Sequence, residues 1–221
     1  RWSHPKEGSI GPGEFVPVAE SSGLSLALGD WVLDEVCRQQ RAWLDAGKPV
    51  VPVSVNLSAA QFGDRRLLEK IRDSLTAHAI DPGLIDIEIT ETALMRDLEL
   101  ATEVSRGLVD LGLRLSIDDF GTGYSSFGYL RRLPVAELKI DRTFVMNIAE
   151  SESDKAILRA MADLGHSLGL EVLAEGIETE DQRQAIAEAG CDHGQGYLLS
   201  RPVRAEDVVL DAEREEGYVI G

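Results

Sequence analysis

Five short stretches of the chain alternate apolar and polar residues with the two-residue period that is typical of a half-buried β-strand. Ile85–Thr90 is the clearest example, because isoleucines at positions 85, 87 and 89 are interleaved with polar residues. A last short strand is predicted near the end of the chain. The predicted strands are Val50–Asn56, Ile85–Thr90, Leu113–Asp118, Ala136–Ile140, Leu170–Ala174 and Gln195–Leu199.

The segments between these strands carry apolar residues at helical spacing. Leu24–Ala46 is the longest, and Gly47 and Pro49 mark its end. The other predicted helices are Ser58–Ala79, Ala93–Leu111, a short one at Ser125–Arg132, Ser153–Leu168 and Thr179–Ala189. The opening segment Arg1–Ala19 is rich in glycine and proline, so an irregular loop is expected there, with a helical turn near Glu14–Glu20. Regular alternation of strands and helices predicts an α/β domain with parallel strands.

The polar face of each strand distinguishes between the possible α/β architectures. Strands covered by helices on both sides would be nearly continuous apolar runs, and these strands are not. Each polar face ends, at the carboxyl end of its strand, on a residue with a functional side chain. In a closed (β/α)8 barrel of the TIM type these ends converge on one rim, where active sites lie. The residues are Asn56, Glu88, Asp118, Lys139 and Glu175.

Length and charge narrow the classes of function. A chain of 221 residues is ample for one domain, and no linker-like segment divides it. Its formal net charge of −17 disfavours DNA and RNA polymers as partners. No apolar run is long enough to span a membrane and no signal peptide is visible, so a cytoplasmic protein is expected. Cys37 and Cys191 are expected to be reduced thiols.

A rim holding Glu88, Asp118, Asp119 and Glu175 would gather four negative charges against the one positive charge of Lys139. Divalent cations resolve such repulsion. Carboxylate oxygens and the amide oxygen of Asn56 suit Mg²⁺ or Mn²⁺ better than Zn²⁺. Two ions bridged by one carboxylate, here that of Asp118, are a common arrangement for hydrolysing a phosphodiester.

The stretch Leu115–Ser126 also has a simpler interpretation. Taken alone, it is equally compatible with a turn in which Asp118 or Asp119 caps a helix. Its Asp-Phe-Gly tripeptide lacks the other motifs of protein kinases, and its glycines do not form a P-loop. Asp86 and Glu171 lie deeper on their strands and are expected to be structural, while His78 and His166 fall on predicted helices and are expected at the surface or in packing.

Six motifs, in order along nearly the whole chain, resemble those of the EAL-domain cyclic di-GMP phosphodiesterases. The opening Arg1-Trp2-x-His4-Pro5 and the segment Glu14–Glu20 fit the same family. The six motifs are Val55-Asn56-Leu57-Ser58, Glu88-Ile89-Thr90-Glu91-Thr92, Asp118–Ser126, Leu138-Lys139-Ile140-Asp141-Arg142, Ala174-Glu175-Gly176-Ile177-Glu178-Thr179 and Gln195-Gly196-Tyr197.

The resemblance implies a (β/α)8 barrel that hydrolyses cyclic di-GMP to linear 5′-pGpG with two Mg²⁺ or Mn²⁺ ions, and that Ca²⁺ inhibits. By residue match, Asn56, Glu88 and Asp118 would bind one ion, and Asp118, Asp119 and Glu175 the other. Glu175 would be the general base, and Lys139 would orient or help activate the attacking water. Gln195 would lie at the nucleotide end of the site, and Arg1 would touch a substrate phosphate.

The resemblance also implies a regulatory loop that connects substrate, metal ions and a homodimer interface. Glu91 would anchor this loop, and Glu178 is grouped with it as a regulatory residue. The loop itself comprises Asp119, Phe120, Gly121, Thr122, Gly123, Tyr124, Ser125 and Ser126. Members of this kind are expected to carry sensor or diguanylate-cyclase-type domains beside the phosphodiesterase domain, within a cytoplasmic protein or the cytoplasmic part of a membrane-anchored one.

One departure from the family pattern concerns the Glu-Ala-Leu signature, whose glutamate is a ligand of the first metal ion. It would lie just before Arg1, together with the first two strands of the barrel, so Arg1–Gly221 is expected to be a single, N-terminally incomplete domain. An open barrel would bind metal more weakly. Two alternatives to a cyclic di-GMP phosphodiesterase stay open. One is a catalytically inactive cyclic di-GMP receptor or scaffold. The other is a metal-dependent barrel enzyme of the enolase type, which also uses carboxylates and a lysine at strand ends.

Overall fold

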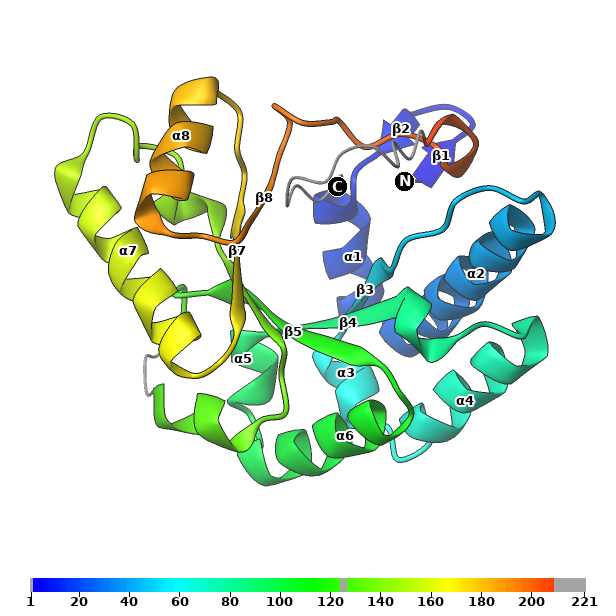
Figure 1. Cartoon of the computed structure of the whole chain (residues 1–221). Coiled ribbons are helices and arrows are strands. Elements are labelled where there is room, and N and C mark those ends of the chain that lie inside the picture. The colour runs from blue at the N-terminus through cyan, green and yellow to red at the C-terminus, as the bar shows by residue number, and fades with distance from the viewer. Residues whose placement is uncertain (1, 124–126, 209–221) are drawn as a thin grey trace.

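The computed structural model describes residues 2–123 and 127–208, and in them the main sheet has six parallel strands (Figure 1). Strand neighbours in space are also neighbours in sequence, from β3 at one edge to β8 at the other. The sheet is curled, with helices along its outer side, as in part of a (β/α)8 barrel. The strands are β3 (Val53–Leu57), β4 (Ile85–Thr90), β5 (Arg114–Phe120), β6 (Glu137–Ile140), β7 (Glu171–Glu175) and β8 (His193–Gln195).

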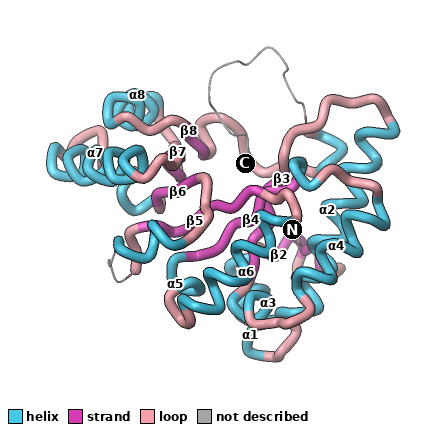
Figure 2. Tube along the Cα trace, turned by 60° about the horizontal axis from the view of Figure 1, so that its bottom comes forward, coloured by secondary structure: helices cyan, strands magenta, loops and turns pink. Residues whose placement is uncertain are grey.

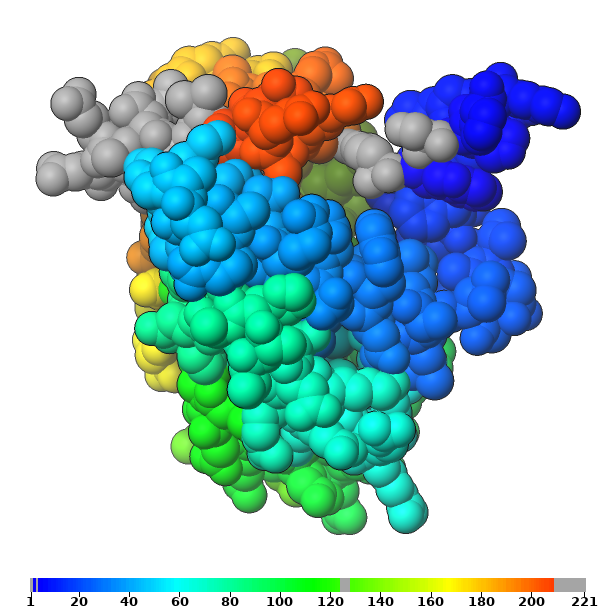
Figure 3. All heavy atoms as spheres, turned by 90° about the vertical axis from the view of Figure 1, so that its right-hand side faces the viewer, coloured from blue at the N-terminus to red at the C-terminus, as the bar shows by residue number. Residues whose placement is uncertain are grey.

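Helices follow the strands and cover the convex face of the sheet (Figure 2). Figure 3 shows that the first half of the chain, coloured blue to green, forms most of one side of the molecule. The helices are α2 (Ser25–Asp45), α3 (Ala59–Phe62), α4 (Leu67–His78), α5 (Glu91–Leu94), α6 (Leu98–Asp110), α7 (Glu152–Ser167) and α8 (Glu180–Ala189). Short 3-10 helices lie at Pro82–Leu84, Phe127–Arg132, Arg142–Phe144 and Ala205–Asp207.

The core lies between the apolar face of the sheet and these helices, as the alternation predicts. On β4, Ile85, Ile87 and Ile89 are completely buried, and Leu115 and Ile117 continue the layer on β5. A second cluster packs β6 and β7 against α7 and α8. Because the apolar face is used in this way, the polar side chains of the same strands are left on the concave side.

The opening segment differs from the expected irregular loop. It forms an antiparallel hairpin of β1 (Trp2–His4) and β2 (Gly8–Ile10), followed by α1 (Pro12–Ser21). Gly8 adopts a φ of 76°, which lets the chain reverse there without steric cost. Pro12 has the fixed φ that suits the first position of a helix. The predicted turn near residues 14–20 is therefore the interior of a ten-residue helix.

Two predicted helices are each divided in the structure. In place of Ser58–Ala79 there are α3 and α4, and Ser58 caps α3 through a reciprocal capping box with Gln61. In place of Ala93–Leu111 there are α5, capped by Thr90, and α6, capped by Asp97. Asp97 satisfies a backbone N–H group at the start of α6, whereas Arg66 before α4 makes no side-chain cap hydrogen bond.

The last strand also lies earlier than predicted, at His193–Gln195 rather than Gln195–Leu199. The chain turns at Gly196 because its backbone passes directly over that of Ile177, and a Cβ there would stand only 2.1 Å from the carbonyl oxygen of Ile177. The N–H of Ile177 donates to the carbonyl of Gln195, and the carbonyl of Ile177 accepts the N–H of Leu198. Only glycine fits this crossing.

Both cysteines are free thiols, as expected from the sequence. Burial raises the pKa of Cys37 to about 11 and that of Cys191 to about 12, so neither is an activated nucleophile. In the described part of the chain, every helix is too short or too polar to cross a lipid bilayer.

A buried amide joins α2 to the start of the sheet. Gln40 is fully buried, and its Nε2 donates to the carbonyl oxygens of Val51 at 2.7 Å and of Leu84 at 3.0 Å. These carbonyls precede β3 and β4, so one side chain fixes where both strands begin. A buried carbonyl that loses its donor loses stability.

We therefore expect Gln40→Met to lower the free energy of unfolding by roughly 1–3 kcal/mol, because two carbonyl groups lose their shared donor while the side-chain volume is kept. Urea unfolding followed by circular dichroism measures the change. Gln39→Met on the same helix, at a half-exposed position, is the matched control and should be close to neutral. Equal losses in the two variants would show that the amide of Gln40 does not hold the strand starts.

Candidate active site

The concave side of the sheet gathers charged side chains from neighbouring strands at their carboxyl ends. Asn56 on β3 is in register with Glu88 on β4, and Glu175 on β7 is in register with Gln195 on β8. Asp118 on β5 lies beside Thr90, the last residue of β4. Parallel strands that run in register place these ends together on one rim.

Lys139 on β6 is the centre of this group. The residue is 4% exposed, and its Nζ lies 2.6 Å from Oε1 of Glu88 and 2.7 Å from Oε1 of Glu175. A third carboxylate oxygen, Oδ1 of Asp118, lies 3.5 Å from the same nitrogen. Asn56 donates from Nδ2 to Oε2 of Glu88 at 2.8 Å, so five strand-end residues form one connected network.

A bulge in β5 brings two consecutive aspartates to the same pocket. Ile117 pairs with Leu138 and Phe120 pairs with Ile140, so β5 has one more residue than β6 across this interval. Asp119 adopts a φ of 54°, a left-handed conformation that costs energy outside glycine. In a regular strand, neighbouring side chains point to opposite faces. Here carboxylate oxygens of Asp118, Asp119 and Glu175 all lie within 4.8 Å of one another.

Burial dominates the electrostatics of these groups. It raises the pKa of Asp118 and of Glu175, and the positive charge of Lys139 only partly opposes the effect. Burial also raises the pKa of Asp119, and the nearby negative charge of Asp141 adds to the shift. Burial alone would lower the pKa of Lys139, but the surrounding carboxylates outweigh it and raise the pKa above its usual range. The ammonium group therefore stays charged.

The residues present fit a divalent cation. Oδ1 of Asp118 is buried and, among the described residues, accepts no hydrogen bond, an unusual state for a carboxylate oxygen. Its neighbours in the pocket offer carboxylate oxygens, the donors preferred by hard cations such as Mg²⁺ and Mn²⁺. Four carboxylates share a single ammonium group, so added positive charge would offset the cost of burying their negative charges.

The predicted loop anchor is also in place. Glu91, the first residue of α5, is 2% exposed, and its Oε2 accepts the backbone N–H of Gly121 at 3.2 Å. A Cβ on Gly123 would stand 3.0 Å from the same carboxylate, so the turn passes closely over Glu91. Thr122 closes the turn by donating from its Oγ1 to the carbonyl of Asp119 at 2.8 Å.

The other predicted site residues lie outside the network of five strand-end residues around Lys139, or outside the described part of the chain. Gln195 lies beside Glu175 at the sheet edge, half-buried. Phe120 is buried in the core at the end of β5. Glu178 is exposed, and its backbone N–H donates to Gln182. Arg1 and residues 124–126, which are Tyr124, Ser125 and Ser126, lie outside the described residues.

Sequence reasoning assigned no role to two residues that border the site. Asp141 follows β6 directly, caps the next turn and contributes to the raised pKa of Asp119. Its position right after a strand end was the available signal. Tyr129 is buried beside Glu91, whose negative charge adds to the effect of burial and raises the pKa of the tyrosine. Nothing in the local sequence pattern indicates that contact.

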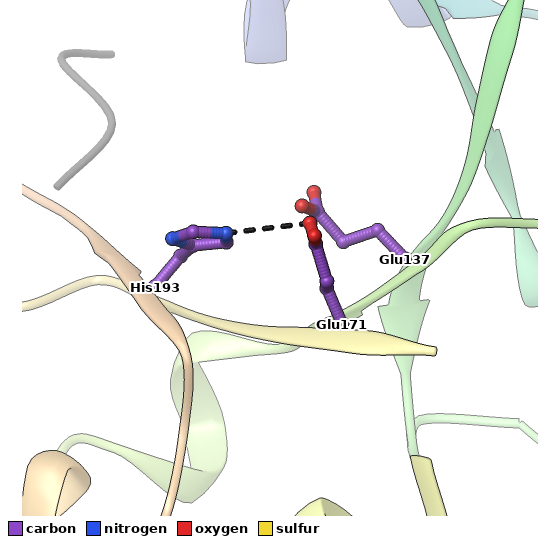
Figure 4. A group of neighbouring side chains, drawn as sticks. All are labelled: Glu137, Glu171 and His193. Carbon is purple, nitrogen blue, oxygen red and sulfur yellow. Dashed lines mark hydrogen bonds and ion pairs between the residues drawn. The ribbon is translucent and has the colours of Figure 1, made fainter. Parts of the chain in front are cut away.

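A second group of possible metal ligands lies at the opposite ends of the strands (Figure 4). Glu137, Glu171 and His193 each offer an atom within 4.8 Å of the others, and Nε2 of His193 lies 3.3 Å from Oε2 of Glu171. Arg114 already pairs with both carboxylates, that of Glu171 and, at 3.4 Å, that of Glu137. Its guanidinium supplies compensating positive charge at this end of the strands.

Comparison with known proteins identifies the family. A family model described as the EAL domain matches residues 1–202. The bifunctional diguanylate cyclase/cyclic di-GMP phosphodiesterase MucR of Pseudomonas aeruginosa is 46% identical over 209 residues, covering 95% of this chain and 30% of MucR. The cyclic di-GMP phosphodiesterase NbdA of the same organism is 42% identical over 203 residues, covering 92% of this chain and 26% of NbdA.

A solved structure of the MucR phosphodiesterase in complex with c-di-GMP superimposes with a TM-score of 0.88 at 47% identity, covering 93% of this chain and 83% of that one. The chain spans less than a third of the length of either curated relative. The resemblance seen in the motifs and the barrel predicted from the strand faces are both confirmed. The chain belongs to the EAL-domain family, and its curled sheet of six strands is part of an EAL-type (β/α)8 barrel.

Proposed function

We propose that this domain hydrolyses cyclic di-GMP to linear 5′-pGpG in a reaction that requires two divalent cations, Mg²⁺ or Mn²⁺. The observation that carries the proposal is the network in which Lys139 joins Glu88, Asp118 and Glu175 from three different strands. The family relationship supports the substrate, because MucR and NbdA are named as cyclic di-GMP phosphodiesterases.

The proposed cation ligands form two sets that share Asp118. Asn56, Glu88 and Asp118 would hold one cation, and Asp118, Asp119 and Glu175 the other. The close approach of the last three carboxylates supports this division, as does the buried oxygen of Asp118 that accepts no hydrogen bond from a described residue. When bound, such cations polarise the phosphodiester and make a water molecule more acidic.

The proposed roles of the protein side chains follow from their positions. Glu175 accepts a proton from the attacking water, whose oxygen forms the new bond to phosphorus while the bond to the ribose 3′ oxygen breaks, and that oxygen takes a proton from solvent to become the 3′ hydroxyl. Lys139 lies 2.7 Å from the carboxylate of Glu175 and fixes its orientation. Gln195 lies on the strand next to Glu175 and would contact the nucleotide, while the turn after Asp119 would carry regulatory changes to the site.

The domain is proposed to act in the cytoplasm as one part of a longer signalling protein, since its curated relatives are more than three times its aligned length. Homodimer formation and flanking sensor or diguanylate-cyclase-type domains stay predictions from the family resemblance.

A second candidate function is a cyclic di-GMP receptor without turnover. Formation of 5′-pGpG in the presence of Mg²⁺ separates the enzyme from the receptor.

The sharpest test of the base assignment is Glu175→Gln, which keeps the shape of the side chain but removes its capacity to take a proton. We expect formation of 5′-pGpG to fall by roughly 100-fold or more, measured by chromatography of the products with Mg²⁺ present.

Glu171→Gln is the matched control, since it makes the same chemical change on the same strand at the opposite end of the sheet. It should leave turnover within about twofold of the parent, because Glu171 pairs with Arg114 and not with Lys139. Turnover of Glu175→Gln close to the parent rate would remove Glu175 from the role of base.

Exchange of the cation tests the two-ion requirement. Ca²⁺ prefers more ligands and longer bonds than Mg²⁺, so we expect it to occupy the carboxylate pocket without supporting hydrolysis. Added Ca²⁺ should then inhibit the Mg²⁺-dependent reaction competitively in a product assay. Brisk formation of 5′-pGpG with Ca²⁺ as the sole divalent cation would contradict the proposed arrangement.

A further inference from the structure

The carboxylate of Glu91 is buried beneath the turn that follows Asp119. Its Oε2 accepts the N–H of Gly121 at 3.2 Å. A carboxylate has two oxygens and can accept several hydrogen bonds, and a buried one without enough donors is unfavourable. The carboxylate of Glu91 can therefore accept a second hydrogen bond while it binds the turn after Asp119.

Tyr129 supplies a hydroxyl group at the right place. It lies on the 3-10 helix Phe127–Arg132, is 3% exposed, and its hydroxyl is buried with no hydrogen-bond partner among the described residues. A hydroxyl in that state is rare in proteins, and a phenylalanine would fill the same space without it. The neighbouring charge of Glu91 opposes ionisation of Tyr129, so the hydroxyl keeps its proton and stays a donor.

We propose that Tyr129 is a positioning residue for the turn at residues 119–123, acting through Glu91. The hydroxyl of Tyr129 and the carboxylate of Glu91 are buried close to each other, and a carboxylate that holds one N–H can accept a hydroxyl as a second donor. The hydroxyl then steadies the carboxylate that holds the N–H of Gly121. Because Asp119 begins this turn, the position of its carboxylate in the pocket depends on the same chain of contacts.

The consequence for catalysis rests on the function proposed above. Asp119 is a proposed cation ligand, and small displacements of a reacting group cost rate steeply. The turn is closed by the bond from Thr122 to the carbonyl of Asp119, so loosening it at Gly121 shifts Asp119 directly. Tyr129 is thereby expected to influence kcat more than KM, although it touches neither substrate nor cation.

The test compares Tyr129→Phe, Glu91→Gln and the double variant in the whole chain. We expect each single variant to lower kcat about tenfold, with KM changed less, and the double variant to lose no more than either single one. Such non-additivity is the mark of residues acting through one another. Independent, multiplying losses would overturn the proposal, as would full activity of Tyr129→Phe.

Amide hydrogen exchange at Gly121, followed by NMR without substrate, gives a readout that does not need turnover. Protection of this amide should fall in Tyr129→Phe to the level of Glu91→Gln, whereas unchanged protection would overturn the positioning role. If the parent chain makes no 5′-pGpG but the exchange result holds, the proposed function fails and the positioning role stands.

Ser105→Ala is the matched control for both measurements. Ser105 lies on α6 and is also fully buried with an unpartnered hydroxyl among the described residues. Its removal should leave kcat, KM and the exchange of Gly121 unchanged. A change in Ser105→Ala equal to that in Tyr129→Phe would show that the effect is general to the core, and would overturn the assignment to Tyr129.

Discussion

The burial of one ammonium group among three carboxylates is the interaction on which the site depends. Lys139 brings a charge into a region where its side chain is almost wholly shielded from water, and Glu88 and Glu175 approach it to hydrogen-bond distance. Breaking a buried ion pair of this kind costs roughly 3–5 kcal/mol, because the remaining charges are left uncompensated. The strand ends of β4, β5, β6 and β7 are therefore held together by electrostatics on the concave side as well as by packing on the convex side.

Backbone geometry decides how many carboxylates can share that ammonium group. Alternation in a regular strand would send Asp118 and Asp119 to opposite faces of the sheet. The extra residue of β5 and the left-handed conformation of Asp119 direct both toward Glu175. Strain of this kind persists only where surrounding contacts maintain it, and the bonds to Gly121 and to the carbonyl of Asp119 are such contacts. The contact between Glu91 and Gly121 and the position of the Asp119 carboxylate in the acidic pocket thus depend on each other.

The sequence predicted what depends on local periodicity and missed what depends on contacts between distant segments. The alternation in Ile85–Thr90 correctly gave the buried and the polar face of β4, because side-chain direction in a strand follows from residue number alone. The bulge at Asp119 is a matter of register with β6, which no single strand encodes. The breaks after Phe62 and Leu94 interrupt a continuing apolar pattern, and the hairpin at Trp2–Ile10 is too short to show one. The side chains that meet around Lys139 could be predicted because they end their strands, whereas the position of Tyr129 depends on its packing near Glu91.

The two charged clusters on the concave face differ in how far the chain itself balances their charge. At the amino ends of β6 and β7, Arg114 lies between Glu137 and Glu171, so each carboxylate has a cationic partner within the chain. At the carboxyl ends of the same strands, Lys139 faces Glu88, Asp118, Asp119 and Glu175, and one ammonium group cannot compensate four carboxylates. Burial raises the pKa of Asp118, Asp119 and Glu175, and the positive charge of Lys139 offsets only part of that effect. The same strands thus have one end whose charge is balanced by the protein and one end whose remaining charge is best balanced by divalent cations.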